Sequence, residues 1–480
     1  MKVLLINPPI EESILKPVLK NLFYNSPPLG LCYIAAVLKK NKVVVKIIDA
    51  AVERLSILKI IKRVEKMNPD VVGLTSTTYS FPFALILAKE IKKYFKDIVI
   101  IMGGSHITAN PDVLLRFNCF DFGVLGEGEV TMTELIECLK YNGNFEDVPG
   151  LAFERKEKLF FSPKRQFIED LDCLPFPDRD LVPLDLYRPQ PNDWNVLPKL
   201  SMITTRGCSY GCIFCDKGVF GMKYRSFSPK YIVAEMKMLI DKYGAKDIAF
   251  LDSTFTTSIE RVKDVILEIK RSKVDVNWTC TVRANVVTYD LLKEMKNAGC
   301  WRIRIGVESA NNNVLKFIKK GITIEDVRKV SKWADSLGLQ PKGFFSIGHL
   351  IDTKETINET IEFAKKAYFK DITVQINTPL KGTPQYKICE KYGVLSNKNN
   401  VDYSFWQPFF VPNGMTKEEL TRLHNKFYRT FYCRFVIIRR HIKAIKGIGD
   451  IKKYILSIDL ITYLFFNRLY DNKCKQKANR

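Results

Sequence analysis

The sequence has little of several features that would classify it quickly. No window reaches the ~18 to 20 unbroken apolar residues that a membrane-spanning helix needs, so no span is predicted. The chain opens directly on the strand-like run 3–6, and no signal peptide is predicted. Acidic residues are comparatively scarce, because 52 Asp and Glu against 75 Lys and Arg give a net charge of +23. That balance suits nucleic acid, an anionic membrane surface or an acidic substrate, and alone it selects none of them.

The length and the cysteine content bound the class of protein. Twelve cysteines are present, but a chain of 480 residues without a leader is not typical of a disulfide framework. Reduced thiols in a reducing cytoplasm fit better, so a cytoplasmic location is expected. A hydrophobic fraction of 46% favours buried cores over disorder. Two large domains and a tail are natural for this length.

Residues 1–140 alternate strand-like and helix-like runs. The strand-like runs are apolar and fall at 3–6, 43–48, 71–76, 98–104 and 122–125. Repeated βα units with apolar strands predict a doubly wound, Rossmann-like parallel sheet. In such sheets the ligand lies beyond the carboxyl ends of the strands. The small or polar residues at those ends are Thr75, Ser76, Gly103, Gly104, Gly126 and Glu127.

The stretch 206–215 is the most informative part of the chain. It contains Cys208, Cys212 and Cys215, spaced C-x-x-x-C-x-x-C directly after a strand-like run. Three thiolates on a four-iron cube leave one iron without a protein ligand, and that iron can bind a small molecule. Phe214 would shield such a cluster from solvent. The alternatives are a zinc site short of its fourth ligand or a chance grouping of cysteines.

From residue 199 the alternation of strands and helices resumes. The strand-like runs number six and fall at 200–204, 247–251, 276–283, 302–307, 343–347 and 372–376. Six βα units predict a partial, TIM-like (β/α)6 barrel over 199–385, with its chemistry at the carboxyl ends of the strands. Polar or small residues follow four of these runs: Asp252 and Ser253, Arg283, Glu308 and Ser309, and Gly348.

The cysteine spacing resembles the signature of the radical S-adenosylmethionine enzymes, in which the methionine group of the cosubstrate binds the open iron. The segments around the second and fourth strand ends also resemble that family. By this resemblance, Asp252 or Ser253 would meet the methionine amino group. Arg283, Glu308 and Ser309 would bind its carboxylate and the ribose, which are suitable partners for a cation and for polar groups.

The fifth strand agrees with that family only in part. Residues 343–348 match its glycine element, which ends at Gly348. The P-G-E-T sequence that usually follows is replaced here by residues 350–356. The loop after this strand, and any substrate contacts made by it, are therefore expected to differ.

Four short motifs in the first domain resemble the cobalamin-binding domain that precedes many radical S-adenosylmethionine domains; they are residues 7–9, 27–31, 103–106 and 126–129. In that family, small residues at the Ser76, Gly103 and Gly104 positions let the corrin and its nucleotide tail lie against the sheet. One version of the domain supplies a lower axial histidine from the motif D-x-H-x-x-G. Ala51 occupies that position here, so cobalamin is expected to lack this ligand. His106 is either a neighbour of the corrin or a loop histidine bonded to the backbone.

The resembled family includes cobalamin-dependent methylases of unactivated carbon and the anaerobic magnesium-protoporphyrin ester cyclase. It implies a [4Fe-4S] cluster that cleaves S-adenosylmethionine to a 5′-deoxyadenosyl radical, with methyl transfer from cobalamin in the methylases. Ferredoxin or flavodoxin is the expected electron donor. Three alternatives remain: a cobalamin-independent radical enzyme that couples carbons or inserts sulfur, an RNA-modifying enzyme, and a non-catalytic cobalamin sensor.

Two further regions complete the predicted organisation. Residues 141–198 are predicted to form a small β excursion and a proline-rich linker, and 386–480 a basic helical region with 16 Lys or Arg and 5 Asp or Glu from residue 417 onward. Apolar residues recur there at helical spacing, at Leu423, Phe427, Phe431, Phe435 and Ile438. A basic amphipathic helix predicts peripheral contact with the inner face of the membrane and favours a lipid- or isoprenoid-like substrate. A helical cap packed on the barrel is the alternative, and nucleic acid is not favoured because no added RNA-binding module is recognised.

Overall fold

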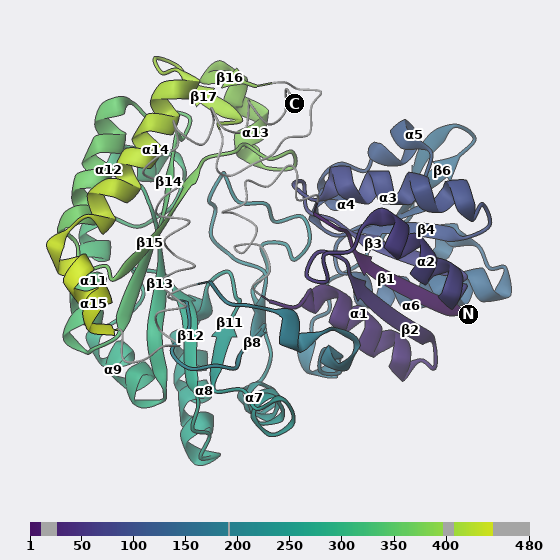
Figure 1. The fold of residues 1–480 in the computed structure, drawn as a ribbon, viewed down its shortest axis with the longest axis horizontal. Helices are drawn as coiled ribbons and strands as arrows, with labels where there is room; N and C mark the ends of the chain where they lie inside the picture. Colours follow the sequence, from purple (N-terminus) through teal and green to yellow (C-terminus); the bar gives the residue numbers. More distant parts are fainter. Residues whose placement is uncertain (11–25, 191–192, 397–407, 445–480) are drawn as a thin grey trace.

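The computed structural model describes residues 1–10, 26–190, 193–396 and 408–444. Within these residues the chain forms two lobes, each built on its own sheet (Figure 1). The first sheet has seven strands and the second has six. The predicted combination of a Rossmann-like domain and a partial barrel is confirmed.

The N-terminal sheet has the strand order β2-β1-β3-β4-β5-β6-β7. Strands β2 to β5 are parallel, and β6 and β7 are antiparallel to their neighbours. The bounds are β1 (Lys2–Asn7), β2 (Val44–Asp49), β3 (Val71–Thr75), β4 (Val99–Gly103), β5 (Phe122–Val124), β6 (Leu151–Arg155) and β7 (Lys158–Phe161). The predicted β excursion is therefore part of this sheet, because β6 pairs with the short strand β5 and covers its open edge.

Helices cover both faces of this sheet, as the doubly wound prediction requires. Leu31 and Leu135 belong to the core on one face, and Ile60 and Leu87 to the core on the other. The bounds are α1 (Leu29–Lys40) and α6 (Gly128–Tyr141) on the first face, α2 (Ile57–Met67) and α3 (Phe81–Tyr94) on the second, and the short α4 (Ser105–Ala109) and α5 (Val113–Phe117).

The second sheet is entirely parallel and has the order β15-β14-β13-β12-β11-β8. Its strands overlap all six predicted runs: β8 (Lys199–Met202), β11 (Asp247–Phe250), β12 (Asn277–Val282), β13 (Cys300–Glu308), β14 (Gln340–Ile347) and β15 (Asp371–Ile376). Strands that follow one another along the chain are neighbours in this sheet. The sheet curves into half of a barrel (Figure 1). Its carboxyl ends consequently lie along one rim.

Several outer helices of the half-barrel begin at residues whose side chains cap the first turn. Ser228 accepts a hydrogen bond from the N–H of Tyr231, and Thr323 with Asp326 forms a capping box. The bounds are α7 (Pro229–Tyr243), α8 (Ile259–Arg271), α9 (Tyr289–Asn297), α10 (Asn312–Phe317), α11 (Ile324–Ser336) and α12 (Lys354–Lys366).

The C-terminal elements follow the last strand of the half-barrel along the chain. They are α13 (Pro384–Ile388), β16 (Gly393–Leu395), β17 (Phe410–Pro412), α14 (Lys417–Tyr432) and α15 (Phe435–Ala444). Helix α14 packs on α12 and β15, so the predicted helical cap on the barrel is present. Among the helices described, none has both the length and the apolarity to cross a membrane. The apolar stretch 454–466 lies outside the described residues.

Candidate functional site

The three cysteines lie in a loop between two short strands, β9 (Thr205–Arg206) and β10 (Arg225–Ser226), which pair antiparallel. We call residues 207–224 the cysteine loop. It begins at Gly207, whose φ is +78° and where a Cβ would collide with the carbonyl oxygen of Lys223, so only glycine fits. The strand pair closes the loop at its base.

Neighbouring elements fix the middle of the cysteine loop. The N–H of Ile213 donates to the carbonyl of Ile318 at 3.1 Å, just after α10. The carbonyl of Ile213 accepts from the N–H of Gln385 in α13 at 3.0 Å. The N–H of Cys208 donates to the carbonyl of Gly221 at 3.4 Å. The backbone between the second and third cysteines is thus held from two sides by the barrel.

The three thiols are close enough to influence one another. Burial, together with the neighbouring thiols of Cys208 and Cys212, raises the pKa of Cys215 to about 11. A bound cation that stabilises thiolates would offset both effects. In the described part of the chain, no three His, Cys, Asp or Glu side chains converge as a single metal ion requires. A cube presents a separate iron to each thiolate, so this donor set fits a cluster better than the zinc alternative.

Two of the predicted S-adenosylmethionine ligands, Arg283 and Glu308, gather beside the cysteine loop. The Arg283 guanidinium stacks at 3.6 Å on the ring of Tyr210, which lies inside the loop. Glu308 pairs with Lys320 at 2.7 Å, and the Lys320 Nζ lies 5.9 Å from the centre of the Phe214 ring. Arg283 also donates to the carbonyl of Lys320. Lys320 therefore connects these groups, and sequence reasoning missed it because it lies in a helix-to-helix turn and not at a strand end.

Another predicted ligand, Asp252, is engaged within the fold. Both oxygens of Asp252 accept hydrogen bonds, from the N–H groups of Thr204 and Thr205 and from the Thr204 hydroxyl. Burial raises the pKa of Asp252, and Arg261 opposes that shift. Asp252 therefore helps to position the start of the cysteine loop, and these bonds give no support to the prediction that Asp252 or Ser253 meets the methionine amino group. Ser253 beside it is exposed.

Ser309 and Gly348 also have structural partners. The Ser309 hydroxyl is buried, lies 3.4 Å from that of Thr360 and accepts from the N–H of Asn311 at 3.2 Å. Gly348 has a φ of +79°, and its N–H donates to Asp352. The polar groups of both residues thus serve the fold, and the predicted role of Ser309 in binding ribose gains no support.

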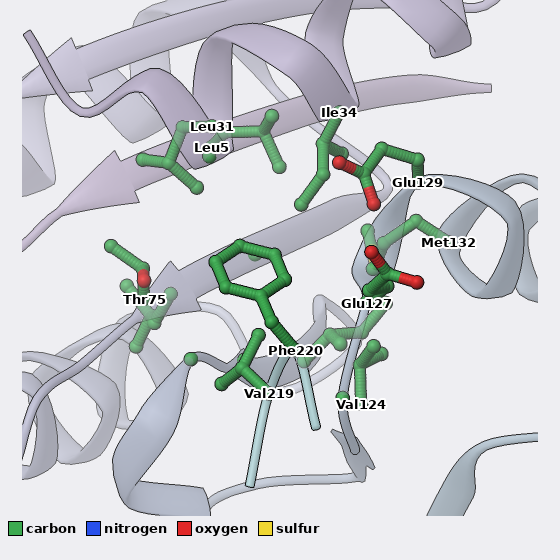
Figure 2. Close-up of a pocket in the computed structure, with 18 residues that line it drawn as sticks. Leu5, Leu31, Ile34, Thr75, Val124, Glu127, Glu129, Met132, Val219 and Phe220 are labelled. Carbon is green, nitrogen blue, oxygen red and sulfur yellow. The ribbon is translucent and has the colours of Figure 1, made fainter. Parts of the chain in front are cut away.

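A pocket lies at the carboxyl edge of the N-terminal sheet (Figure 2). We call it the sheet-edge pocket, and its volume is about 120 Å³. Thr75, Gly103, Gly104, Gly126 and Glu127, all predicted, line it. Its other lining residues are mostly apolar or small: Leu5, Gly30, Leu31, Ile34, Gly73, Leu74, Ile101, Val124, Gly128, Glu129, Met132, Val219 and Phe220. An open, glycine-rich sheet edge with apolar walls suits a flat aromatic group such as the benzimidazole of a cobalamin tail.

Ser76 and His106 do not line the sheet-edge pocket. The Ser76 hydroxyl donates to the sulfur of Met102 at 3.4 Å. The His106 ring stacks on Phe81 with centroids 4.0 Å apart, and its Nδ1 lies 3.4 Å from the Thr78 hydroxyl. Burial lowers the pKa of His106 to about 4, so it is neutral near pH 7. Both side chains are thus engaged within the fold, so neither the predicted contact of Ser76 with the cofactor nor the alternative that His106 is a neighbour of the corrin gains support.

Ala51 is buried in the hydrophobic core on the α1 side of the sheet. A histidine at this position would have to displace apolar neighbours. The local packing is therefore consistent with the predicted absence of an axial histidine from this motif.

The cysteine loop and the sheet-edge pocket meet directly. Val219 and Phe220 of the loop line the pocket, and Figure 2 shows the Phe220 ring among its walls. Glu127, which also lines the pocket, pairs with Arg206 at 2.9 Å, one residue before the loop begins. The two lobes are thus in contact at the site.

Four buried charges join the lobes, and we call them the charge quartet: Arg206, Arg225, Glu127 and Glu129. Arg206 also pairs with Glu129 at 2.5 Å, and Arg225 pairs with Glu127 at 2.8 Å. All four side chains are at most 5% exposed, and the two positive charges balance the two negative ones. Sequence reasoning missed the two arginines, because their partners lie some 80 to 100 positions earlier in the chain.

The comparisons with known proteins agree with this geometry. Residues 202–364 match the model of the radical SAM superfamily, and residues 15–136 match that of the B12 binding domain. An uncharacterized methyltransferase from Pyrococcus horikoshii is 34% identical over 92% of this chain and 95% of its own length. Cytidylyl-2-hydroxyethylphosphonate methyltransferase from Streptomyces wedmorensis is 27% identical over 90% of each. The relatives also include anaerobic magnesium-protoporphyrin IX monomethyl ester cyclases.

A solved structure shares the fold of both lobes. The cobalamin-dependent S-adenosylmethionine radical enzyme OxsB, with aqua-cobalamin bound, superposes with a TM-score of 0.75. The two chains are 18% identical, and the superposition covers 96% of this chain and 72% of the OxsB chain. The sequence matches identify both domains, and the architecture agrees with them. The two domain types together imply an iron–sulfur cluster, S-adenosylmethionine and cobalamin as cofactors. The chain belongs to the radical SAM superfamily and is one of its enzymes that carry an N-terminal B12-binding domain.

Proposed function

We propose that this enzyme methylates an unactivated carbon atom with the help of cobalamin. The observation that supports this most directly is the contact between the cysteine loop and the sheet-edge pocket, through Val219 and Phe220. When bound, the cluster with S-adenosylmethionine supplies a radical that takes hydrogen from carbon, and cobalamin supplies the methyl group. The protein has to hold these two cofactors beside one substrate.

In this proposal each group of residues has a binding or positioning task. Cys208, Cys212 and Cys215 hold three irons of the cluster. Arg283 and Glu308, organised around Lys320, lie where the polar end of S-adenosylmethionine would be bound. The glycine-rich edge at Gly103 and Gly104 would accept the cobalamin tail, without a lower histidine ligand.

The substrate in this proposal is lipid- or isoprenoid-like, and the basic C-terminal region brings the enzyme to an anionic membrane surface. Helix α15 supports this, because Phe435, Val436 and Ile438 are 75%, 71% and 44% exposed. Arg434 and Arg439 lie beside them in the sequence. Apolar side chains flanked by cations are typical of interfacial helices. Ferredoxin or flavodoxin is the proposed electron donor, and the net charge of +23 suits an acidic protein.

The function is tested by anaerobic reconstitution with iron, sulfide and cobalamin. Lipid extract is then incubated with S-adenosylmethionine that is isotopically labelled in its methyl group. We expect 5′-deoxyadenosine, S-adenosylhomocysteine and a labelled lipid, all dependent on cobalamin. Cleavage that proceeds equally without cobalamin would favour the cobalamin-independent enzyme, and an unlabelled cyclised product would favour the cyclase. No cleavage despite an intact cluster would favour the cobalamin sensor.

The membrane contact is tested separately by flotation with vesicles of anionic phospholipid. The full chain should float with anionic vesicles and not with neutral ones, and Phe435→Ser should reduce the bound fraction. Equal recovery with both vesicle types would contradict an electrostatic membrane contact. Steeply salt-dependent binding to RNA in the same buffers would instead revive the nucleic-acid alternative.

A further inference from the structure

Phe220 forms part of the wall around the space that the proposed function assigns to the cobalamin tail. Its ring lies among the walls of the sheet-edge pocket, near Leu5, Leu31 and Ile34 (Figure 2). The space beside the ring measures about 120 Å³. A cavity that takes one benzene ring measures about 150 Å³, and a benzimidazole is larger than benzene. Seating the tail there therefore requires a wall to move, and the Phe220 ring belongs to the wall that the cysteine loop supplies.

Phe220 is also linked to the first cysteine through the backbone. Its neighbour Gly221, with a φ of +70°, accepts the N–H of Cys208 at 3.4 Å through its carbonyl. The Phe220 carbonyl accepts from Arg225 of the charge quartet at 3.1 Å. A displacement of Phe220 and Gly221 would therefore change the hydrogen bond that holds Cys208.

A second link runs through the side chain. The Arg206 guanidinium lies 5.2 Å from the centre of the Phe220 ring and 5.2 Å from that of Tyr33. Arg206 thus stands between an aromatic ring of each lobe, and it precedes Cys208 by two positions. Removing the Phe220 ring from the pocket would remove one of its two cation–π contacts.

We propose that Phe220 is a positioning residue that couples cobalamin binding to the cysteine loop. This inference rests on the proposed function, since it requires that the sheet-edge pocket takes the cobalamin tail. In this proposal the Phe220 ring packs against the pocket walls whenever no corrinoid is bound. Entry of the tail displaces the ring, moves Gly221 and changes the setting of Cys208, so the cluster is set for reaction only when cobalamin is present.

The binding test uses two corrinoids, hydroxocobalamin and cobinamide, which lacks the nucleotide tail. In Phe220→Ala the ring no longer has to leave the pocket, so hydroxocobalamin should bind roughly tenfold more tightly than to the wild type. Cobinamide should bind both forms equally. Met222→Ala is the matched control, because Met222 belongs to the same loop, is 53% exposed and does not line this pocket. Phe220→Leu, which keeps an apolar side chain, should give an intermediate affinity.

Equal or weaker hydroxocobalamin binding by a folded Phe220→Ala variant overturns the coupling role and leaves the proposed function intact. A wild-type enzyme that binds neither corrinoid overturns both. A gain in affinity that is equal for cobinamide overturns it too, because the effect would then not depend on the tail.

The coupling itself has a spectroscopic readout that does not depend on turnover. Hydroxocobalamin should change the electron paramagnetic resonance spectrum of the reduced cluster in the wild type and speed hydrogen exchange in peptides that contain Cys208. Cobinamide should do neither. In Phe220→Ala the spectrum should be the same with and without hydroxocobalamin. A cofactor-induced change of equal size in wild type and variant overturns the proposal.

Discussion

At the scale of single residues, the site depends on a few backbone positions as much as on its reactive side chains. Cys208, Cys212 and Cys215 can face one cluster because Gly207 turns the chain and Ile213 is bonded on both sides. The cysteine spacing predicted that these three thiols face one cluster. It did not predict the bonds to Ile318 and Gln385, because hydrogen bonds between distant parts of the chain leave no local sequence signal.

Loss of one cysteine should empty the cluster site. In Cys215→Ala two thiolates remain, which is too few to retain the proposed cube, so bound iron should fall from about four per chain toward zero. Iron analysis and visible absorbance after anaerobic reconstitution measure this. Cys433→Ser is the matched control, since that thiol is free and exposed. Full iron content in Cys215→Ala would contradict the assignment of the cysteine loop.

The two neighbouring glycines of the sheet-edge pocket should respond differently to alanine. At Gly104, φ is +98° and ψ is −173°, a region almost restricted to glycine, and a Cβ would lie 2.5 Å from the Ser76 carbonyl oxygen. At Gly103 the nearest atom to a Cβ, the Leu74 carbonyl oxygen, is 3.9 Å away. Gly104→Ala should therefore lower the free energy of unfolding by roughly 1 to 3 kcal/mol, and Gly103→Ala by much less.

Denaturant unfolding measures the stability of both glycine variants, and a corrinoid titration measures their affinity. Gly103→Ala should weaken hydroxocobalamin binding with little change in stability, because it adds a methyl group to the pocket wall. Equal destabilisation by the two substitutions would show that the backbone at Gly104 relaxes.

Asp252 and His106 show where reading single residues from sequence reaches its limit. Its position at a strand end predicted that Asp252 belongs to the site, and the structure places it beside the start of the cysteine loop. Its task could not be predicted, because the N–H groups of Thr204 and Thr205 use the same oxygens. His106 also follows a strand end, but its ring stacks on Phe81 and is buried in the fold.

At the scale of elements, helix α14 completes the half-barrel by covering the open edge of β15. The Tyr428 hydroxyl accepts from the N–H of Val374 at 2.9 Å and donates to its carbonyl at 3.1 Å. Tyr432 makes the same pair of bonds with Ile372, and His424 lies 3.0 Å from the Val374 carbonyl. An edge strand that would otherwise expose unpaired groups is thereby protected.

This second, polar stripe of α14 was not predicted. The apolar stripe that includes Phe427 and Phe431 was predicted, because its residues recur at helical spacing. His424, Tyr428 and Tyr432 recur at the same spacing. Nothing in the sequence indicated that their partner would be backbone, since an edge strand is defined only by the assembled sheet.

His424 gives the docking of α14 a predictable pH dependence. Burial lowers its pKa to about 4, whereas a histidine in the unfolded chain has a pKa of about 6.5. The unfolded state therefore binds more protons between these values, so stability is full above about pH 6.5 and falls as pH falls toward 4. Between about pH 7.5 and about pH 5 the wild type should lose about 2 kcal/mol more than His424→Gln.

Chemical denaturation at both pH values measures this difference. The quantity compared is the change in unfolding free energy between the two pH values in each protein. A loss of packing in His424→Gln that is the same at both pH values therefore cancels. His106, whose pKa is also lowered to about 4, titrates equally in both proteins. Parallel pH profiles for the two proteins would contradict a buried, neutral His424.

At the scale of the whole molecule, both sheets and their order along the chain could be predicted, but the way they meet could not. Periodicity and strand-end residues predicted each lobe because those signals are local. The predicted boundary at residue 140 missed the hairpin of β6 and β7, which continues the first sheet. The charge quartet and Phe220 lie at the interface between the lobes, and such contacts depend on the assembled arrangement.

The stability that the charge quartet contributes should therefore depend on its charge balance more than on the presence of any single member. Arg206→Met leaves two buried carboxylates and one guanidinium, and breaking a buried pair in this way typically costs about 3 to 5 kcal/mol. Adding Glu129→Gln should recover much of that loss, because Glu129 pairs with Arg206 while Glu127 keeps Arg225. Thermal unfolding, together with proteolysis of the linker between the lobes, measures both effects. A double variant no more stable than Arg206→Met would mean that these residues join the lobes by shape, and that their charges contribute little.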